Sequence, residues 1–308
     1  MRLIHLQNDT YAAVIDLDCG ANCINLTYLP TQAHLLREQA DPTAEPDNPC
    51  LYGMPILFPV NRISGGSFDF DGRTYTFPVN EPATGCHLHG TLHSTRFTLE
   101  EADDTHAVCV YTAEAGEYLT FPHAFTITMT YRLTEGGMTH TVAVANRSAA
   151  RMPCLLGFHT TFNALPSPHS RPEDIRVQVE IAEEYARDMR TCLPTGEKPA
   201  FDAVSTALNA GEFCPIGRPI SRHYRARPGG RMVLRDAGQG LSVVYTPDPA
   251  LGFRLIYNGP ADGYICLEPQ TALANSPKSP FSRAEAGFGW LEPGETRTYV
   301  SEICAATK

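Results

Sequence analysis

The chain of 308 residues has no hydrophobic run that approaches the length of a membrane helix. Such a helix needs roughly 18 or more consecutive apolar residues. The N-terminal segment also lacks a basic stretch followed by an apolar core, and Asp16 and Asp18 interrupt its hydrophobic pattern. We therefore expect a cytoplasmic protein that does not contact a membrane.

Blocks of like charge are absent as well, although the formal net charge is −10. Nucleic acids and anionic membranes bind surfaces on which basic residues cluster. The composition therefore argues against nucleic acid as a partner, and it favours a small, neutral or polar ligand.

The ten cysteines form no CxxC pair. They are scattered along the chain, and most lie within apolar, strand-like runs, where cysteine usually acts as a small buried hydrophobic residue. This spacing predicts neither a zinc site nor a redox motif. We expect free thiols in a reducing compartment.

Short runs of alternating polar and apolar residues, rich in β-branched side chains, are abundant. Turn residues separate these runs, which are residues 3–6, 11–16, 22–28, 96–101, 107–113, 125–133, 138–146, 175–181, 232–235, 241–246, 253–257, 264–268 and 297–304. A short helix is possible within residues 201–211, and residues 30–50 are expected to be a loop or a short helix. Residues 186–230 are otherwise expected to leave the sheets. The pattern predicts an all-β protein, a large antiparallel β-sandwich or barrel, which we interpret as a single domain of residues 1–308.

A hairpin is predicted within residues 67–77. Both halves alternate polar with aromatic residues, and Asp71-Gly72 lies between them. This dipeptide is favoured in two-residue turns because both positions require positive φ.

Candidate site residues lie on either side of this hairpin. The apolar run that ends at Pro59 delivers Asn61 and Arg62, where a side chain can face a cleft, although Arg62 could equally be a surface arginine at a loop start. If the later segment is extended, His87 and His89 point to the same face, because strand side chains repeat every second residue.

Two more polar residues interrupt apolar runs. His159 follows Leu-Leu-Gly-Phe, a context in which histidine is most often a hydrogen-bonded core residue. Glu268 ends an apolar strand before Pro269, so it is either an exposed strand end or part of a site, since glutamate is rarely buried without a partner. Both interpretations stay open for each residue.

His87 and His89 could bind a metal ion if they share a face. A metal-binding cupin barrel would place a glutamate about four residues after the second histidine, but His93 stands there. The chain also lacks a nucleophilic serine or cysteine motif and a phosphate-binding glycine loop. A carboxylate, imidazoles and an arginine instead suit proton transfer on a polyhydroxylated molecule.

In their order and spacing, several motifs resemble the aldose 1-epimerases (galactose mutarotases). They are GA at 20–21, PVNRI at 59–63 followed by GGSF, LHG at 88–90, FHTTFN at 158–163, LPTGE at 193–197, LEPQT at 267–271 with Asn275 beyond, and LEPGE at 291–295. The resemblance covers most of the chain. It implies a galactose mutarotase-like β-supersandwich with the sugar in an open cleft on one sheet.

The resemblance implies an isomerase of carbohydrate metabolism that interconverts the α and β anomers of an aldohexose or modified hexose, without a cofactor, as a monomer or homodimer. Glu268 would be the general base that takes the proton of the C1 hydroxyl, and His159 the acid that protonates the ring oxygen. His89 and Arg62 would hold the ring-oxygen side and neighbouring hydroxyls, and His87 is carried over only as a cleft residue. We expect burial to raise the pKa of Glu268, and a nearby carboxylate to raise that of His159.

One departure concerns specificity. Relatives that act on free galactose usually carry an aspartate that contacts the sugar, whereas the comparable register here, SRHY at 221–224, has no acid. Arg222, Arg225 and Arg227 could then form an anion pocket. The alternatives are therefore an epimerase of a phosphorylated or otherwise anionic sugar, a non-catalytic sugar-binding protein on the same fold, and a metal-dependent isomerase that uses His87 and His89.

Overall fold

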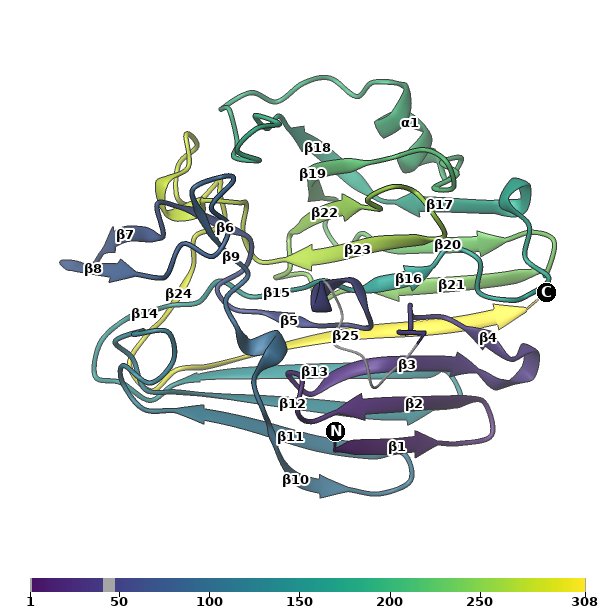
Figure 1. Cartoon of the computed structure of the whole chain (residues 1–308), viewed down its shortest axis with the longest axis horizontal. Coiled ribbons are helices and arrows are strands. Elements are labelled where there is room, and N and C mark those ends of the chain that lie inside the picture. The colour runs from purple at the N-terminus through teal and green to yellow at the C-terminus, as the bar shows by residue number, and fades with distance from the viewer. Residues whose placement is uncertain (1, 41–47, 308) are drawn as a thin grey trace.

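The computed structural model describes residues 2–40 and 48–307, and β-strands dominate it (Figure 1). The largest sheet has eight strands, in the spatial order β10 (Thr98–Ala102), β11 (His106–Ala113), β12 (Phe125–Thr134), β13 (Gly137–Asn146), β25 (Thr296–Thr307), β21 (Leu241–Thr246), β20 (Met232–Asp236) and β17 (Ile175–Val179). Neighbouring strands run antiparallel. The C-terminal strand β25 lies between β13 and β21, so it joins the two halves of this sheet.

Two further sheets lie in front of the eight-stranded sheet in Figure 1. The seven-stranded sheet has the order β18 (Ile181–Tyr185), β19 (Ser221–Ala226), β22 (Phe253–Tyr257), β23 (Tyr264–Gln270), β15 (Gly157–Phe158) and β5 (Ile56–Leu57), and β16 (Thr161–Asn163) also pairs with β23. The four-stranded sheet consists of β1 (Leu3–Gln7), β2 (Tyr11–Asp16), β3 (Asn22–Tyr28) and β4 (Ala33–His34). The expected antiparallel β-sandwich is confirmed.

Shorter elements complete the described chain. Three two-stranded ribbons pair β6 (Arg62–Ser64) with β9 (Cys86–Leu88), β7 (Ser67–Phe70) with β8 (Arg73–Thr76), and β14 (Met152–Pro153) with β24 (Trp290–Leu291). The α-helix is α1 (Ala203–Ala210), and 3₁₀ turns occur at Leu29–Thr31, Pro49–Leu51, Leu92–Ser94, Pro172–Asp174 and Ser276–Lys278. Helices in the described ranges are too short or too polar to cross a membrane.

The core lies between the layers, and alternation along the strands builds it. In β12, Phe125, Ile127 and Met129 are buried and the residues between them are not, because successive strand side chains point to opposite faces. Each such buried side chain contributes about 1.5–3 kcal/mol to folding. Tyr131, further along β12, donates a 2.7 Å hydrogen bond to the backbone oxygen of Ala21 and so ties the eight-stranded sheet to the four-stranded one.

The predicted hairpin within residues 67–77 and the short helix within residues 201–211 are confirmed. Asp71 and Gly72 have φ of 52° and 72° between β7 and β8, as a two-residue hairpin turn requires. Helix α1 begins after Asp202, whose side chain accepts hydrogen bonds from two backbone N–H groups, and ends at Gly211 in the left-handed region. The ten cysteines, all within the described ranges, are free thiols as expected.

The predicted strand at residues 175–181 is two strands in two sheets. The chain leaves the eight-stranded sheet after β17 and enters the seven-stranded sheet as β18, with Glu180 between them. Strand β19 was not expected, because its sequence SRHYRA has three cationic or imidazole side chains and little apolar alternation. These two strands build the edge of the sheet that carries the candidate site.

Gly157 lets β15 pack beside β23. A Cβ atom at this position would lie 2.5 Å from Val60 Cγ2 and 3.1 Å from Gln270 Cγ. We expect Gly157→Ala to lower the free energy of unfolding by about 1–3 kcal/mol, as overpacked core substitutions do. Urea unfolding measures this change.

Gly252→Ala is the matched control for that measurement. No heavy atom lies within 4 Å of the Cβ position there, and the residue does not have a positive φ. We expect a change below about 1 kcal/mol. Equal destabilisation by both substitutions would show that close approach at Gly157 is not the cause.

Candidate active site

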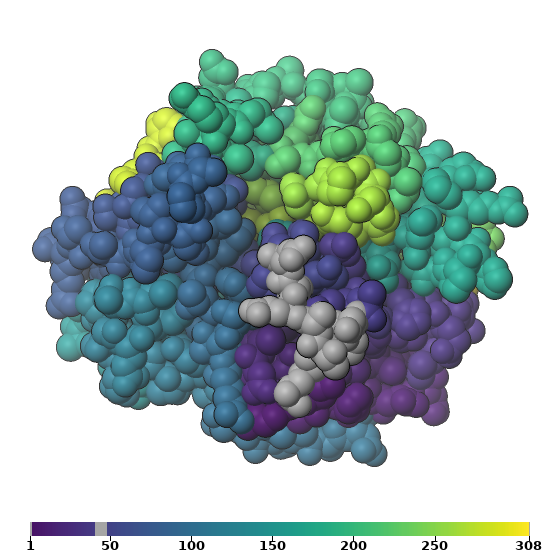
Figure 2. Space-filling model, viewed as in Figure 1, coloured from purple at the N-terminus to yellow at the C-terminus, as the bar shows by residue number. Residues whose placement is uncertain are grey.

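A cavity of about 400 Å³ opens on the outer face of the seven-stranded sheet. Leu267 of β23 belongs to the core, so Glu268, the next residue along the strand, points to the opposite face and lines the cavity. In Figure 2 the surface is recessed between the blue and the yellow-green segments of this face. The volume lies within the range of roughly 300–1,000 Å³ that is typical of small-molecule sites.

Glu268 is fully buried at the base of this cavity. Its Oε2 accepts a 3.1 Å hydrogen bond from Nε2 of Gln270, whereas its Oε1 has no hydrogen-bond partner among residues 2–40 and 48–307. Burial raises the pKa of Glu268 to about 8, although the bond from Gln270 and the positive charge of Arg187 oppose the shift. The expected rise is confirmed, and the carboxyl is mostly protonated at neutral pH.

A chain of amides holds Glu268 in place. The backbone N–H of Arg62 donates to Oδ1 of Asn61 at 2.9 Å, and Nδ2 of Asn61 donates to Oε1 of Gln270 at 3.0 Å. Gln270 then donates to Glu268. Each amide accepts a hydrogen bond through its oxygen and donates one through its nitrogen, and this chain orients the carboxyl of Glu268.

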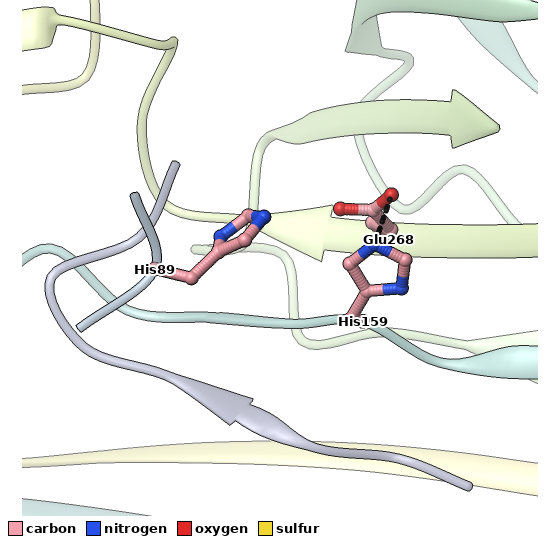
Figure 3. Close-up of side chains that lie close together, drawn as sticks. All are labelled: His89, His159 and Glu268. Atoms are coloured by element: carbon pink, nitrogen blue, oxygen red, sulfur yellow. Dashed lines mark ion pairs between the residues drawn. The ribbon is translucent and has the colours of Figure 1, made fainter. Parts of the chain in front are cut away.

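His159 reaches the cavity because it follows the core residue Phe158. The ring of Phe158 packs against His140 of β13 at 4.9 Å between ring centres, so the next side chain points to the outer face. Nε2 of His159 lies 3.3 Å from Oε1 of Glu268 (Figure 3). The sequence separates these two residues by more than 100 positions, and the pairing of β15 with β23 brings them together.

The expectation for the pKa of His159 is wrong. Burial lowers it to about 4, because an imidazolium loses its hydration in this position. The neighbouring carboxyl does not offset this effect, since Glu268 is itself uncharged over most of the neutral range. The described site therefore rests as a carboxylic acid beside a neutral imidazole.

His89 points its ring toward the same pair (Figure 3). Its Nδ1 accepts a 3.3 Å hydrogen bond from the backbone N–H of Asn61, and its own backbone N–H donates to the oxygen of Asn61 at 3.1 Å. Burial, followed by repulsion from His159 and Arg62, holds the pKa of His89 well below its usual range. The neutral ring therefore carries its proton on Nε2, as a hydrogen-bond donor.

His87 does not join this group. It is buried, its Nδ1–H donates to the backbone oxygen of Pro78 at 2.7 Å, and its ring stacks on Phe77 at 5.0 Å. The prediction that His87 and His89 share a face of a strand is wrong, because β9 ends at Leu88 and His89 has a φ of 63°. His87 is not among the residues that line the cavity.

Arg62 lines the cavity as predicted, but it is paired with an acid that sequence reasoning did not single out. Its Nε and Nη2 each lie 2.7 Å from one carboxylate oxygen of Glu81. Burial would raise the pKa of Glu81, but the hydrogen bonds from Arg62 and Thr84 lower it below its usual value. This two-point contact orients the guanidinium and neutralises its charge.

The predicted anion pocket is not formed. None of its three members lines the 400 Å³ cavity; they are Arg222, Arg225 and Arg227. Arg222 lies 2.7 Å from Asp202, and Arg225 lies 3.3 Å from Glu183. Acids that lie outside β19 therefore pair with Arg222 and Arg225. The sequence around 221–227 does not reveal these pairs.

Sequence reasoning also missed Arg187, Ser221 and Tyr257, all of which line the cavity. Nη2 of Arg187 donates to the backbone oxygen and the Oγ of Ser221, at 2.5 and 2.8 Å. Tyr257 and Ser221 are paired residues on β22 and β19. Arg187 lies in a polar loop with no motif around it, so no sequence signal marked it.

The site could also hold a metal ion. One ligand atom from each of His89, His159 and Glu268 lies within 4.8 Å of the others (Figure 3). Two imidazoles and a carboxylate are ligands that divalent transition metals accept. This trio takes the place of the predicted pair of His87 and His89.

The layered sheets, and a cleft on the outer face that carries a carboxyl, imidazoles and an arginine, define a galactose mutarotase-like β-supersandwich protein. The chain belongs to the aldose 1-epimerase family, whose model matches residues 2–304.

Individual relatives agree with this placement. A galactose mutarotase-like protein from Clostridium acetobutylicum is 28% identical, and its crystal structure matches with a TM-score of 0.93 over 99% of this chain and 95% of that chain. An aldose epimerase homologue from C. elegans shares the fold, with 15% identity and a TM-score of 0.79 over 99% of both chains. The uncharacterized protein YphB of Escherichia coli is 24% identical over 252 residues, which are 79% of this chain and 80% of that protein.

Proposed function

We propose that the protein is an isomerase that interconverts the α and β anomers of an aldohexose or modified hexose by acid–base ring opening. The observation that carries this proposal is the meeting of His159 and Glu268 at 3.3 Å in a sugar-sized cavity. Membership of the aldose 1-epimerase family supports it. The match of one family model to residues 2–304 likewise supports a single domain.

Ring opening needs an acid and a base at one carbon. The C1 hydroxyl gives its proton to Glu268 as the bond from C1 to the ring oxygen breaks, and the electron pair of that bond goes to the ring oxygen, which takes a proton from His159. The product is the open-chain aldehyde. Rotation about the C1–C2 bond presents the other face of the carbonyl, and the reverse steps close the second anomer.

The proton that His159 must donate is held on Glu268 in the free protein, where the pKa values are about 8 for the carboxyl and about 4 for the imidazole. A sugar hydroxyl that donates to the carboxyl of Glu268 favours the carboxylate, as any hydrogen bond to the charged form does. The proton then passes to His159 over 3.3 Å. Whether the proton is on Glu268 or on His159, the two residues hold one proton between them. One of them can therefore act as the acid and the other as the base.

The remaining groups of the cavity hold the sugar. The Nε2–H of His89 and the guanidinium of Arg62 are oriented donors for ring and hydroxyl oxygens. Leu255 and Tyr257 of β22 supply apolar surface beside Glu268. Proton transfer from a positioned side chain is worth roughly 10²- to 10⁴-fold per group, provided that the sugar is held in this way.

Pure anomers test the function directly. Freshly dissolved α-glucose and α-galactose are expected to reach anomeric equilibrium faster with the protein than in buffer, as followed by anomeric proton NMR. Tight binding without acceleration would favour a non-catalytic sugar-binding protein. A stoichiometric transition metal whose removal stops the reaction would favour a metal-dependent isomerase at His89, His159 and Glu268.

We expect kcat/KM, corrected for the buffer rate, to be bell-shaped in pH. As the pH falls through about 4, His159 becomes protonated together with Glu268, and no base remains. As the pH rises through about 8, Glu268 loses its proton while His159 is already neutral, and no acid remains. The two limbs belong to the coupled pair rather than to either residue. A rate that is constant from pH 6 to 10 would contradict this proton count.

A further inference from the structure

Arg187 brings a positive charge to the cavity that no acid of the described residues neutralises. It follows β18 and lines the cavity, as do Cys192 and Ser221. Its hydrogen bonds go to the backbone oxygen and the hydroxyl of Ser221, which are uncharged acceptors. Within residues 2–40 and 48–307, it forms no salt bridge.

The arginines around it are paired. Arg62, which also lines the cavity, pairs with both carboxylate oxygens of Glu81, and Arg222, next to Ser221 on β19, pairs with Asp202. The chain as a whole has a net charge of −10, so acids are in excess. An arginine without an acidic partner, in the cavity of an acidic protein, is therefore a distinguishing feature of this site.

The other arginine of the cavity differs from Arg187 in its partner. Arg62 and Glu81 both line the cavity, and their charges cancel through two contacts of 2.7 Å. Arg187 has only the two oxygens of Ser221 as hydrogen-bond acceptors among the described residues. Its positive charge is therefore left for a ligand.

Hydrogen bonds to Ser221 also orient the guanidinium of Arg187 before any ligand binds. Ser221 of β19 holds Nη2 of the guanidinium, and within the described residues the other N–H groups of Arg187 have no hydrogen-bond partner. Burial lowers the pKa of Arg187, as is expected for a cation with little compensating charge, but a guanidinium stays protonated in proteins. A planar fork of this kind matches the two oxygens of a carboxylate or a phosphate.

We propose that Arg187 binds an acidic substituent of the sugar, so that the substrate class is a hexose that carries a carboxylate or a phosphate. This inference rests on the cavity being the sugar site of the proposed function. The residue is a specificity determinant, because the substituent that it binds is not part of the anomeric centre.

The test compares three sugars with the same ring: glucose, glucuronate and glucose 6-phosphate. Their binding is measured by titration calorimetry with the wild-type protein, with Arg187→Gln and with Arg187→Lys. We expect the wild-type protein to bind at least one anionic sugar about 10- to 100-fold more tightly than glucose, as a charged hydrogen bond allows. Arg187→Gln should remove this preference and leave glucose affinity nearly unchanged, whereas Arg187→Lys should retain part of it.

Arg190→Gln is the matched control. Arg190 is an exposed arginine of the same loop that does not line the cavity, so the substitution removes the same charge without changing the site. We expect wild-type affinities for all three sugars. Thermal unfolding of each variant shows whether the fold is retained, and Arg187→Lys tests the charge if Arg187→Gln unfolds.

A preference for glucuronate identifies a carboxylate as the acidic group, and a preference for glucose 6-phosphate identifies a phosphate; both support the inference. It is overturned if glucose binds as tightly as both anionic sugars, if none of the three binds, or if Arg187→Gln weakens glucose and the anionic sugars equally. Tight anionic binding without faster anomer exchange would leave the role of Arg187 intact and remove the proposed catalytic function instead.

Discussion

Glu268→Gln is expected to slow anomer exchange by roughly 10²- to 10⁴-fold, the usual contribution of one proton-transferring side chain. Glutamine keeps the shape of the side chain and an oxygen that can accept the hydrogen bond from Gln270. It cannot take or hold the proton on which ring opening depends. Sugar affinity should therefore change little, and saturation kinetics with anomeric NMR separate kcat from KM.

The control for this variant is Glu302→Gln, which changes the same functional group on the exposed side of β25. We expect the wild-type rate. If Glu268→Gln equilibrates α-glucose, α-galactose and the anionic sugars at the wild-type rate, then Glu268 does not transfer the proton.

The same substitution should also change how stability depends on pH. The pKa of Glu268 rises from 4.5 to about 8 in the folded protein, so the folded state holds a proton that the unfolded state has released. The contribution of Glu268 to the free energy of unfolding is fully present below about pH 4.5 and is lost as the pH rises through about 8. Glu268→Gln should therefore melt higher than the wild-type protein at pH 9, which also shows that the variant is folded.

His159→Asn is expected to slow anomer exchange by a similar factor of roughly 10²–10⁴. Asparagine keeps a polar group in the buried position but cannot donate a proton to the ring oxygen. Because Glu268 and His159 share one proton, the double variant should be scarcely slower than either single variant. Rates of the three variants form a double-mutant cycle.

His169→Asn is the control for the loss of an imidazole, because His169 is an exposed loop histidine that does not line the cavity. It should retain the wild-type rate. Effects of Glu268→Gln and His159→Asn that multiply in the double variant would mean that the two residues act independently, and the shared-proton mechanism would fail.

Much of the fold could be predicted from short stretches of sequence. The turn at Asp71 and Gly72, the cap at Asp202 and the alternation along β12 depend on neighbouring residues, whose backbone preferences and two-residue period are readable directly. The predicted strand at residues 175–181 was divided at Glu180, where the chain changes sheets, and β19 was missed because charged residues interrupt its alternation. Strands of two or three residues, such as β15 and β16, were also missed because they are too short to show a period.

The site could be predicted only in part. Glu268, His159, His89 and Arg62 do line one cavity, and the order of the family motifs already indicated them. His87 was misplaced because one residue with positive φ, His89, ends the extended backbone on which the prediction relied. Arg187 was missed because a lone arginine in a polar loop has no local signature.

By itself, the sequence determined the strands with regular alternation, the hairpin and the polar residues available for chemistry, because these depend on near neighbours in the chain. Tertiary structure alone decided the charge of the cavity. Glu81 cancels Arg62, Asp202 matches Arg222, and Arg187 is left with Ser221, through contacts between segments that only folding brings together. The protonation of Glu268 and His159 follows the same rule, because burial, which no single segment encodes, sets both pKa values.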